Sequence, residues 1–243
     1  MNTEKIQILS TRPLDDDLVG LAAQQGIILS QQEFIKTVPV VDENLVAEIR
    51  KLAKRDIVAV FTSMNAVESV STIVTPFKPT WRVASIGATT LQLVQKYFTG
   101  ASIIATGESA TDLAHHLADA AGGWELHFFC SNIRRNELPQ VISEYGLKLQ
   151  EWVVYETYEI PVQLQQHYHG ILFFSPSAVR SFFSGNKLDA NVVLFATGNT
   201  TASEIGRYCS NEVVVAANTG KGALVQRALE YFKTQNGQKL LQG

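Results

Sequence analysis

The sequence predicts an α/β protein with two parallel-sheet lobes, and three observations lead to that prediction. Short apolar runs rich in β-branched residues alternate with longer stretches in which apolar residues recur at helical spacing. Such alternation is typical of parallel sheets connected by crossover helices. A series of motifs occurs twice along the chain. The 243 residues, 46% of them hydrophobic, suffice for one large or two modest globular domains.

Strands and helices follow one another along most of the chain. The predicted strands are Ile6–Leu9, Ile57–Phe61, Arg82–Ile86, Ser102–Ala105, Leu126–Cys130, Gly170–Phe174, Val192–Ala196 and Glu212–Val215. Helical spacing is clearest in two sets, Leu91, Val94, Tyr97 and Phe98, and Leu224, Ala228, Tyr231 and Phe232. Two stretches rich in Val, Ile, Phe and Tyr, Ile27–Val40 and Leu147–Pro161, are predicted as extended chain.

The internal repeat has a nearly constant offset. Three pairs of segments define it: 61–67 with 173–179, 85–90 with 196–201, and the strand and helix through Ile103 and Leu113 with those through Val213 and Leu224. A fourth pair, 9–12 leading to Gly26 and 130–132 leading to Gly146, is out of order. The simplest explanation is that the N-terminal strand and helix belong with the C-terminal third of the chain.

This explanation sets the predicted domain boundaries. Residues 1–36 and 160–243 form lobe one, residues 40–154 form lobe two, and residues 37–39 and 155–159 link the lobes. Two lobes joined by two crossings are expected to face one central cleft and to move about the crossings as hinges.

Composition excludes several classes of protein. A formal net charge of −3 provides no overall positive field for nucleic acid or an anionic membrane. The N-terminus lacks the pattern of a signal peptide, and no apolar run reaches the roughly 18 residues of a membrane helix. Cys130 and Cys209 are predicted to be buried free thiols of a reducing compartment. We therefore expect a cytoplasmic protein without membrane or nucleic-acid partners.

Small hydroxyl residues and glycines follow the predicted strands, at the sheet edge where open α/β proteins bind ligands. Helix N-termini there favour carboxylate or phosphate groups. The candidate substrate-binding residues are Arg12, Ser63, Thr90, Ser109, Arg134, Ser175, Ser177, Asn199, Thr200 and Thr201. Each hydroxyl also fits a purely structural role as a helix cap, as in the capping box of Ser109 and Asp112. Each arginine also fits the role of a solvated surface cation.

Other catalytic signatures are missing from the sequence. It contains no Walker loop, no GxGxxG after a strand and no GxSxG elbow, and its histidines lack metal-ligand spacing. We therefore expect neither a cofactor nor a metal. Tyr155 and Tyr158 lie on the second crossing, where a phenol could donate a proton in the cleft or simply brace the linker.

At these residues the sequence resembles the uroporphyrinogen-III synthase family. The motifs that carry the resemblance are Thr11–Pro13, Phe61–Ser63 with Ala66–Val67, Ile86–Gly87 with Thr90, Gly107–Asp112, Val154–Thr157, Phe173–Ser177 and Gly198–Ala202. Each motif is short, and their order and spacing carry the specificity. Some relatives have a basic residue at Asn65, a lysine on the strand at 192–195, or Arg-Gly at Cys130–Ser131. Basic contacts to the substrate are therefore expected to differ here.

The resemblance implies two flavodoxin-like lobes joined by a two-stranded linker and an enzyme that needs no metal and no organic cofactor. It implies the substrate hydroxymethylbilane, a linear tetrapyrrole polyanion, which is cyclised with loss of water and inversion of ring D through a spiro intermediate. It implies that Tyr155 assists departure of the substrate hydroxyl. We expect a monomer, with room for a transient contact with the preceding enzyme of the pathway.

Two alternatives remain open on the sequence alone. A two-lobed cytoplasmic binding protein would close on a small polyanion and convert nothing. A phosphoribosyl or nucleotide enzyme is disfavoured by the missing phosphate loop. Turnover distinguishes the first alternative from the synthase, and nucleotide binding distinguishes the second.

Overall fold

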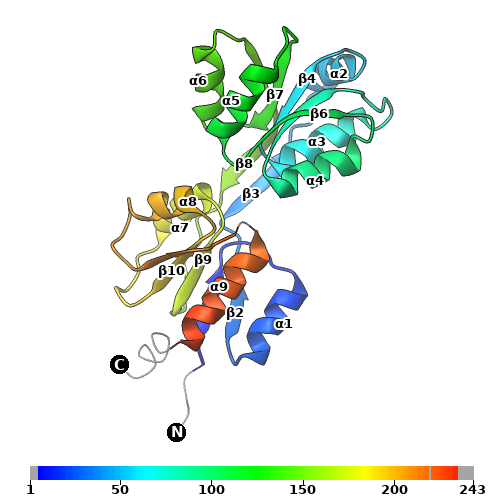
Figure 1. Ribbon diagram of the computed structural model, residues 1–243. Coiled ribbons are helices and arrows are strands. Elements are labelled where there is room, and N and C mark those ends of the chain that lie inside the picture. Colours follow the sequence, from blue (N-terminus) through cyan, green and yellow to red (C-terminus); the bar gives the residue numbers. More distant parts are fainter. Residues whose placement is uncertain (1–4, 219, 235–243) are drawn as a thin grey trace. The chain divides into compact units, whose positions relative to one another are not determined.

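The computed structural model describes residues 5–218 and 220–234, and the chain divides into two compact units (Figure 1). Unit one contains the chain up to Lys36 and from Tyr158 onward, and unit two is Thr37–Thr157. The predicted range of lobe one also includes residues 1–4, 219 and 235–243, which lie outside the described residues. Each unit has its own sheet, made mainly of parallel strands, with helices on both faces.

Unit one is built on a five-stranded parallel sheet in the order β11-β10-β9-β1-β2. Its strands are β1 (Gln7–Ser10), β2 (Ile28–Gln31), β9 (Gly170–Phe173), β10 (Val193–Ala196) and β11 (Val213–Val215). Numbered within the unit, the order is 2-1-3-4-5, the doubly wound flavodoxin-like arrangement. The N-terminal strand β1 therefore lies inside the sheet, between β2 and the strand β9 from the C-terminal part of the chain.

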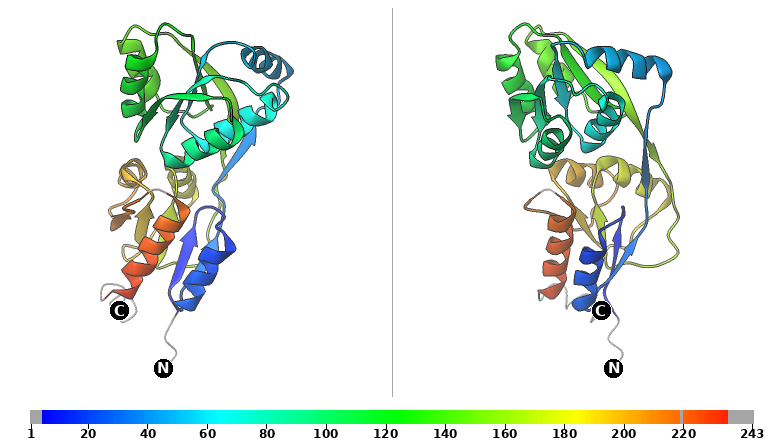
Figure 2. Two further views of the ribbon diagram at one scale, coloured as in Figure 1. Left: turned by 45° about the vertical axis from the view of Figure 1, so that its right-hand side comes forward. Right: turned by 90° about the vertical axis from the view of Figure 1, so that its right-hand side faces the viewer.

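Helices cover both faces of this sheet. They are α1 (Asp16–Gln24), α7 (Pro176–Gly185), α8 (Asn199–Ile205) and α9 (Lys221–Lys233). Successive strand residues point to opposite faces, so Ile8 packs in the cluster that contains α1 and α9 while Leu9 packs with α7 and α8. Figure 2 shows α1 and α9 on the same side of the sheet. The strands are buried on both faces, which explains their unbroken apolar runs.

Unit two is built on a six-stranded sheet in the order β3-β8-β7-β4-β5-β6. Its strands are β3 (Ile35–Pro39), β4 (Val58–Phe61), β5 (Arg82–Ile86), β6 (Ser102–Gly107), β7 (Leu126–Ser131) and β8 (Leu149–Glu159). Its helices are α2 (Glu43–Leu52), α3 (Met64–Val74), α4 (Ala88–Tyr97), α5 (Ala110–Ala120) and α6 (Glu137–Glu144). One core packs α2, α3 and α4 around Phe61 and Trp81, and the other packs α5 and α6 on Val58 and Val60.

The internal repeat corresponds to the same topology in both units. The strands β8-β7-β4-β5-β6 of unit two occupy the places of β2-β1-β9-β10-β11 in unit one, with the chain order permuted. Ser63 and Ser175 cap α3 and α7, and Gly87 and Gly198 precede α4 and α8. The repeated motifs are therefore the strand-to-helix turns at the carboxyl edge of each sheet.

Some sequence expectations need correction. The stretch 27–40 is not one continuous crossing, because β2 at its start is an integral strand paired with β1. The division between the units falls within β3 and β8, which places residues 37–39 and 155–157 in unit two. Cys209 is half-buried rather than buried, while Cys130 is buried as predicted. Tyr97 faces solvent because it lies at the end of α4, whereas its neighbour Phe98 is in the core.

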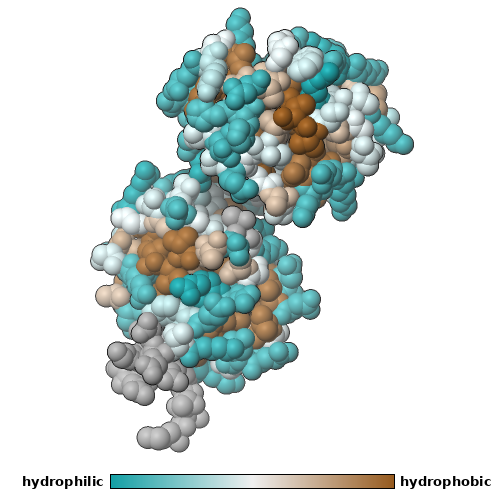
Figure 3. All heavy atoms as spheres, viewed as in Figure 1, coloured by the Kyte–Doolittle hydropathy of each residue, from teal (hydrophilic) through white to brown (hydrophobic). Residues whose placement is uncertain are grey.

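The surface of both units is mainly hydrophilic, with smaller apolar patches between the polar side chains, in the view of Figure 3. Among the described residues no helix combines the length and the hydrophobicity that crossing a membrane requires.

Candidate functional site

Tyr155 is placed by an irregularity in β8. The parallel pairing of β7 and β8 matches Cys130 with Val153 and then Ser131 with Tyr155, so Val154 has no partner residue on β7. Val154 and Tyr155 are consecutive, yet both are buried in the same core cluster. Regular alternation would turn one of them outward. The bulge therefore turns the Tyr155 ring inward at the carboxyl edge of the sheet of unit two, as bulges beside functional sites often do.

Ser63 lies beside the phenol of Tyr155. The Ser63 Oγ is 2.9 Å from the Tyr155 hydroxyl, and either atom could be the donor. The same Oγ accepts a hydrogen bond of 3.2 Å from the Ala66 N–H and so caps the first turn of α3. Because capping fixes the Ser63 side chain, the hydroxyl is held in place against the phenol. The structure thus brings together two of the residues predicted from the sequence.

The surroundings of Tyr155 keep the phenol protonated. Burial raises the pKa of Tyr155 above its usual value of 10.0, and hydrogen-bonding groups on Ser63, Ser131 and Asn65 oppose this only partly. The hydroxyl is therefore a neutral proton donor throughout the physiological range. The three polar neighbours are positioned to stabilise a phenolate if the proton is transferred.

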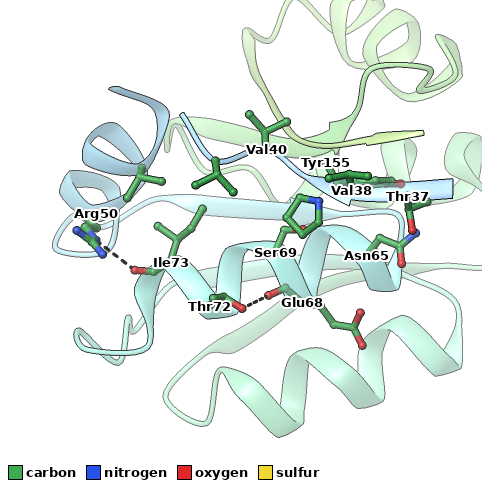
Figure 4. Close-up of a pocket in the computed structure, with 13 residues that line it drawn as sticks. Thr37, Val38, Val40, Arg50, Asn65, Glu68, Ser69, Thr72, Ile73 and Tyr155 are labelled. Carbon is green, nitrogen blue, oxygen red and sulfur yellow. Dashed lines mark hydrogen bonds between the residues drawn. The ribbon is translucent and has the colours of Figure 1, made fainter. Parts of the chain in front are cut away.

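A pocket of about 510 Å³ adjoins Tyr155 within unit two. It lies between β3, α2 and α3, with the Tyr155 ring forming part of its wall (Figure 4). The lining residues are Thr37, Val38, Pro39, Val40, Val41, Val46, Arg50, Asn65, Glu68, Ser69, Thr72, Ile73 and Tyr155. Most of these residues were not predicted as site residues. The amphipathic pattern of α2 is the sequence signal that could have pointed to this wall.

The other candidates of unit two are engaged within the unit to different degrees. Ser109 caps α5 by accepting from the Asp112 N–H at 3.0 Å, and Asp112 in turn accepts from the Glu108 N–H at 2.9 Å. Thr90 is buried in the first turn of α4. Arg134 forms a two-pronged ion pair with Glu151 of β8. Arg134 can therefore reach a substrate carboxylate only by giving up this pair, and its substrate role stays a prediction.

The candidates of unit one lie at the carboxyl edge of its own sheet. Ser175 caps α7 through the Ala178 N–H at 3.2 Å, and its Oγ is 3.0 Å from that of Ser177. The Arg12 guanidinium lies 5.6 Å from the ring centre of Phe174. The remaining candidates, Asn199, Thr200 and Thr201, lie in the first turn of α8. Thr201 is buried, and the other two are exposed.

Two further groups have chemistry of note but lie outside this constellation. Burial raises the pKa of the Cys130 thiol to about 11, so the thiol is a poor nucleophile at neutral pH. His127 is buried and accepts a hydrogen bond of 3.0 Å from the Trp152 indole at Nδ1. Within the described part of the chain no three metal-ligating side chains gather in one place.

By its fold and its site, the chain belongs to the class of α/β proteins with two flavodoxin-like units, one permuted relative to the other, and with polar groups at the carboxyl edge of each sheet. Residues 16–226 match the family model described as Uroporphyrinogen-III synthase HemD. The chain belongs to this family.

Two of the solved structures with a similar fold are bacterial proteins. A mutant uroporphyrinogen III synthase of the extremely thermophilic bacterium Thermus thermophilus is 14% identical, with a TM-score of 0.67 over 98% of this chain and 99% of that one. The uroporphyrinogen-III synthetase of Helicobacter pylori is 13% identical, with a TM-score of 0.66 over 93% of this chain and 99% of that one. At these identities the likeness establishes the fold. A comparison with curated protein sequences finds no match.

Proposed function

We propose that this chain is a uroporphyrinogen-III synthase, which closes hydroxymethylbilane to uroporphyrinogen III with loss of water and inversion of ring D. The observation that carries the proposal is the Tyr155 phenol, which is neutral, buried, 2.9 Å from the Ser63 hydroxyl and in the wall of a pocket. Membership of the family supplies the reaction class. A proton donor beside a small-molecule pocket is what loss of a hydroxyl group requires.

The hydrogen bonds around Ser63 suggest the direction of proton transfer. Ser63 Oγ already accepts from Ala66, and its own proton can be donated to the oxygen of Tyr155. The phenol proton is then available to the leaving hydroxyl of the substrate. The developing phenolate is stabilised by the Ser63 donor, and Asn65 and Ser131 lie close enough to add to this effect.

In the proposed reaction the phenol gives its proton to the substrate hydroxyl, and the C–O bond breaks with release of water. The substituted α-carbon of the terminal pyrrole attacks the methylene carbon left behind, which forms a spiro intermediate. The bond between the substituted α-carbon and the methylene that joined it to the neighbouring pyrrole then breaks, and the free α-carbon of the terminal pyrrole bonds to that methylene. The proton lost from that carbon restores the phenol. The enzyme's greater task is to hold the two ends together and to prevent simple closure.

The proposed substrate is a polyanion, and because the net charge is −3, its carboxylates must be bound by local groups rather than by an overall positive field. Helix N-termini at the carboxyl edges present backbone N–H groups and a favourable dipole to carboxylates. We assign this role to the first turns that carry Thr90, Ser109, Ser175, Ser177 and Asn199–Thr201, together with Arg12. Charge-assisted hydrogen bonds contribute roughly 1.5–3 kcal/mol each, so a few suffice to fix a flexible tetrapyrrole.

A coupled assay tests the proposal. Hydroxymethylbilane is generated in place, the protein is added, and the products are oxidised and separated as uroporphyrin isomers. We expect isomer III to replace isomer I in proportion to the amount of protein. Isomer I alone from correctly folded protein would refute catalysis, and calorimetric binding of the tetrapyrrole without turnover would then identify a binding protein.

A further inference from the structure

The pocket of unit two has an apolar middle and polar ends. Val38, Val40 and Ile73 form its middle, while Arg50 lies at one end and Thr37, Asn65 and Tyr155 lie at the other (Figure 4). Its volume of about 510 Å³ lies within the range of roughly 300–1,000 Å³ that is usual for small-molecule sites. A ligand that fits this lining is a flat apolar ring with an anionic group at one edge and a polar group at the other.

Ser69 indicates that the pocket is suited to a polar ligand. Its side chain is 7% exposed and lines the pocket, and no hydrogen bond of its hydroxyl is found among the described residues. On the same helix, Ser71 and Thr72 each donate to the carbonyl of Glu68, at 2.8 and 3.1 Å, and Thr75 donates to that of Ser71. Unlike these neighbours, Ser69 does not give its proton to a helix carbonyl in the described chain, so its hydroxyl is a donor that a molecule in the pocket can use.

Arg50 supplies the positive charge. Within the described chain Arg50 has no ion pair, and its one hydrogen bond is a long contact of 3.5 Å with the carbonyl of Ile73. The next residue, Lys51, is engaged with Glu48 at 2.6 Å. The pocket also contains the carboxylate of Glu68, but this side chain extends away from Val38 and Tyr155 in Figure 4. The guanidinium therefore keeps donors for a carboxylate at its own end of the pocket.

We propose that this pocket binds one carboxylate-bearing pyrrole ring of the substrate, the ring that carries the leaving hydroxyl. The ring packs between Val38 and Ile73, one of its carboxylates pairs with Arg50, and its hydroxymethyl group points to Tyr155. This inference rests on the proposed function and adds to it a binding residue that the sequence motifs do not contain. Arg50 acts on substrate binding and takes no part in the proton transfer.

Binding of a single ring tests the pocket without requiring turnover. A monopyrrole that carries one acetate and one propionate group is titrated into ¹⁵N-labelled full-length protein. We expect shifts at the amides of Thr37, Asn65 and Ser69, with binding weakened about tenfold or more in Arg50→Ala, the loss of one charge-assisted hydrogen bond. Arg50→Lys should recover part of the affinity. Shifts confined to other regions, or equal affinity for wild type and Arg50→Ala, would overturn the proposal.

Lys51→Ala is the matched control, because it removes the same charge from the same last turn of α2 outside the pocket. Lys51→Ala should bind the monopyrrole like the wild type. Equal weakening in Arg50→Ala and Lys51→Ala would show that only the overall charge matters, and would overturn the assignment of Arg50 as a binding residue. Ser69→Ala should weaken binding by a smaller factor without loss of folding.

The isomer assay separates this proposal from the proposed function. If wild type forms isomer III, Arg50→Ala should raise KM for hydroxymethylbilane and leave kcat nearly unchanged, and an unchanged KM would overturn the pocket assignment alone. If wild type forms no isomer III, the synthase proposal fails. Monopyrrole shifts that depend on Arg50 would in that case still support the pocket as a pyrrole carboxylate site, and their absence would overturn it.

Discussion

The replacement Tyr155→Phe tests the proposed proton donor most directly. The change removes one oxygen and keeps the ring that packs with Val154 and Trp152 in the core of unit two. Ser63 loses its contact with the phenol at 2.9 Å but still caps α3 through Ala66. The folded state should therefore lose only about 1 kcal/mol, the net contribution of one hydrogen bond.

The expected effect on catalysis is much larger than the effect on stability. A positioned general acid contributes about 10²–10⁴-fold, which corresponds to about 2.7–5.4 kcal/mol of transition-state stabilisation at about 1.36 kcal/mol per tenfold. Tyr155→Phe should therefore lower kcat for isomer III by at least about a hundredfold. KM should change little, because the substrate carboxylates bind elsewhere.

The assay is the initial rate of isomer III formation at saturating hydroxymethylbilane, with urea unfolding measured in parallel. Tyr158→Phe is the control, because it makes the same chemical change three residues further along β8 at a side chain that is 49% exposed. The Tyr158→Phe variant should keep the wild-type kcat. A wild-type kcat in Tyr155→Phe would remove Tyr155 from the chemistry, and an equal loss in both variants would point to a general effect on β8.

Three further predictions concern the stability of the fold and the rate of the reaction. Ser63→Ala should lower kcat and destabilise α3 by about 1 kcal/mol through loss of its cap, whereas Ser63→Thr should restore the cap and part of the rate. A wild-type rate in Ser63→Ala would show that the Tyr155 phenol does not need the Ser63 hydroxyl. Gly107→Ala should lower the free energy of unfolding, measured in urea, by about 1–3 kcal/mol or more, because the new Cβ would collide with the backbone nitrogen of Leu113. Gly20→Ala, in open space on α1, should raise it by about 0.5–1 kcal/mol, and equal stability of the two variants would contradict the packing argument. Burial lowers the pKa of His127 in the folded state below its unfolded value of about 6.5, so the unfolded chain binds the extra proton and stability should fall as the pH drops below about 6.5. In His127→Asn the urea midpoint should depend less on pH between about pH 6.5 and 5, and an unchanged pH dependence would assign the effect to other groups.

Much of the fold could be predicted from the sequence because the strands are buried on both faces. The strand Arg82–Ile86 is predicted with its full bounds, and the other predicted strands agree to within two residues at each end. The repeat also identifies the equivalent turns, because Ser63 and Ser175 cap helices by the same local chemistry in both units. Helix α2 is strongly amphipathic, so its apolar face is also a local property that the sequence carries.

The site depended more strongly on long-range contacts. Sequence motifs identify Tyr155 and Ser63 separately, but they are 92 positions apart, and only the pairing of β7 with β4 and β8 brings their oxygens together. The bulge at Val154 has no sequence signature, since it follows from a register shift between two strands. Arg134 illustrates the opposite case, because its motif position suggests a free cation and the fold pairs it with Glu151.

The sequence by itself thus determined the class of fold, the permuted repeat and the family, because hydrophobic periodicity and capping motifs are local properties. Only the tertiary structure decided which hydroxyls meet the phenol, which cations already have partners and where the pocket lies. Those outcomes depend on which strands become neighbours and on the depth at which each side chain is buried. Burial and neighbouring groups set the pKa of Tyr155 and place the Ser69 hydroxyl in the pocket wall, and neither effect is encoded in any short segment of the chain.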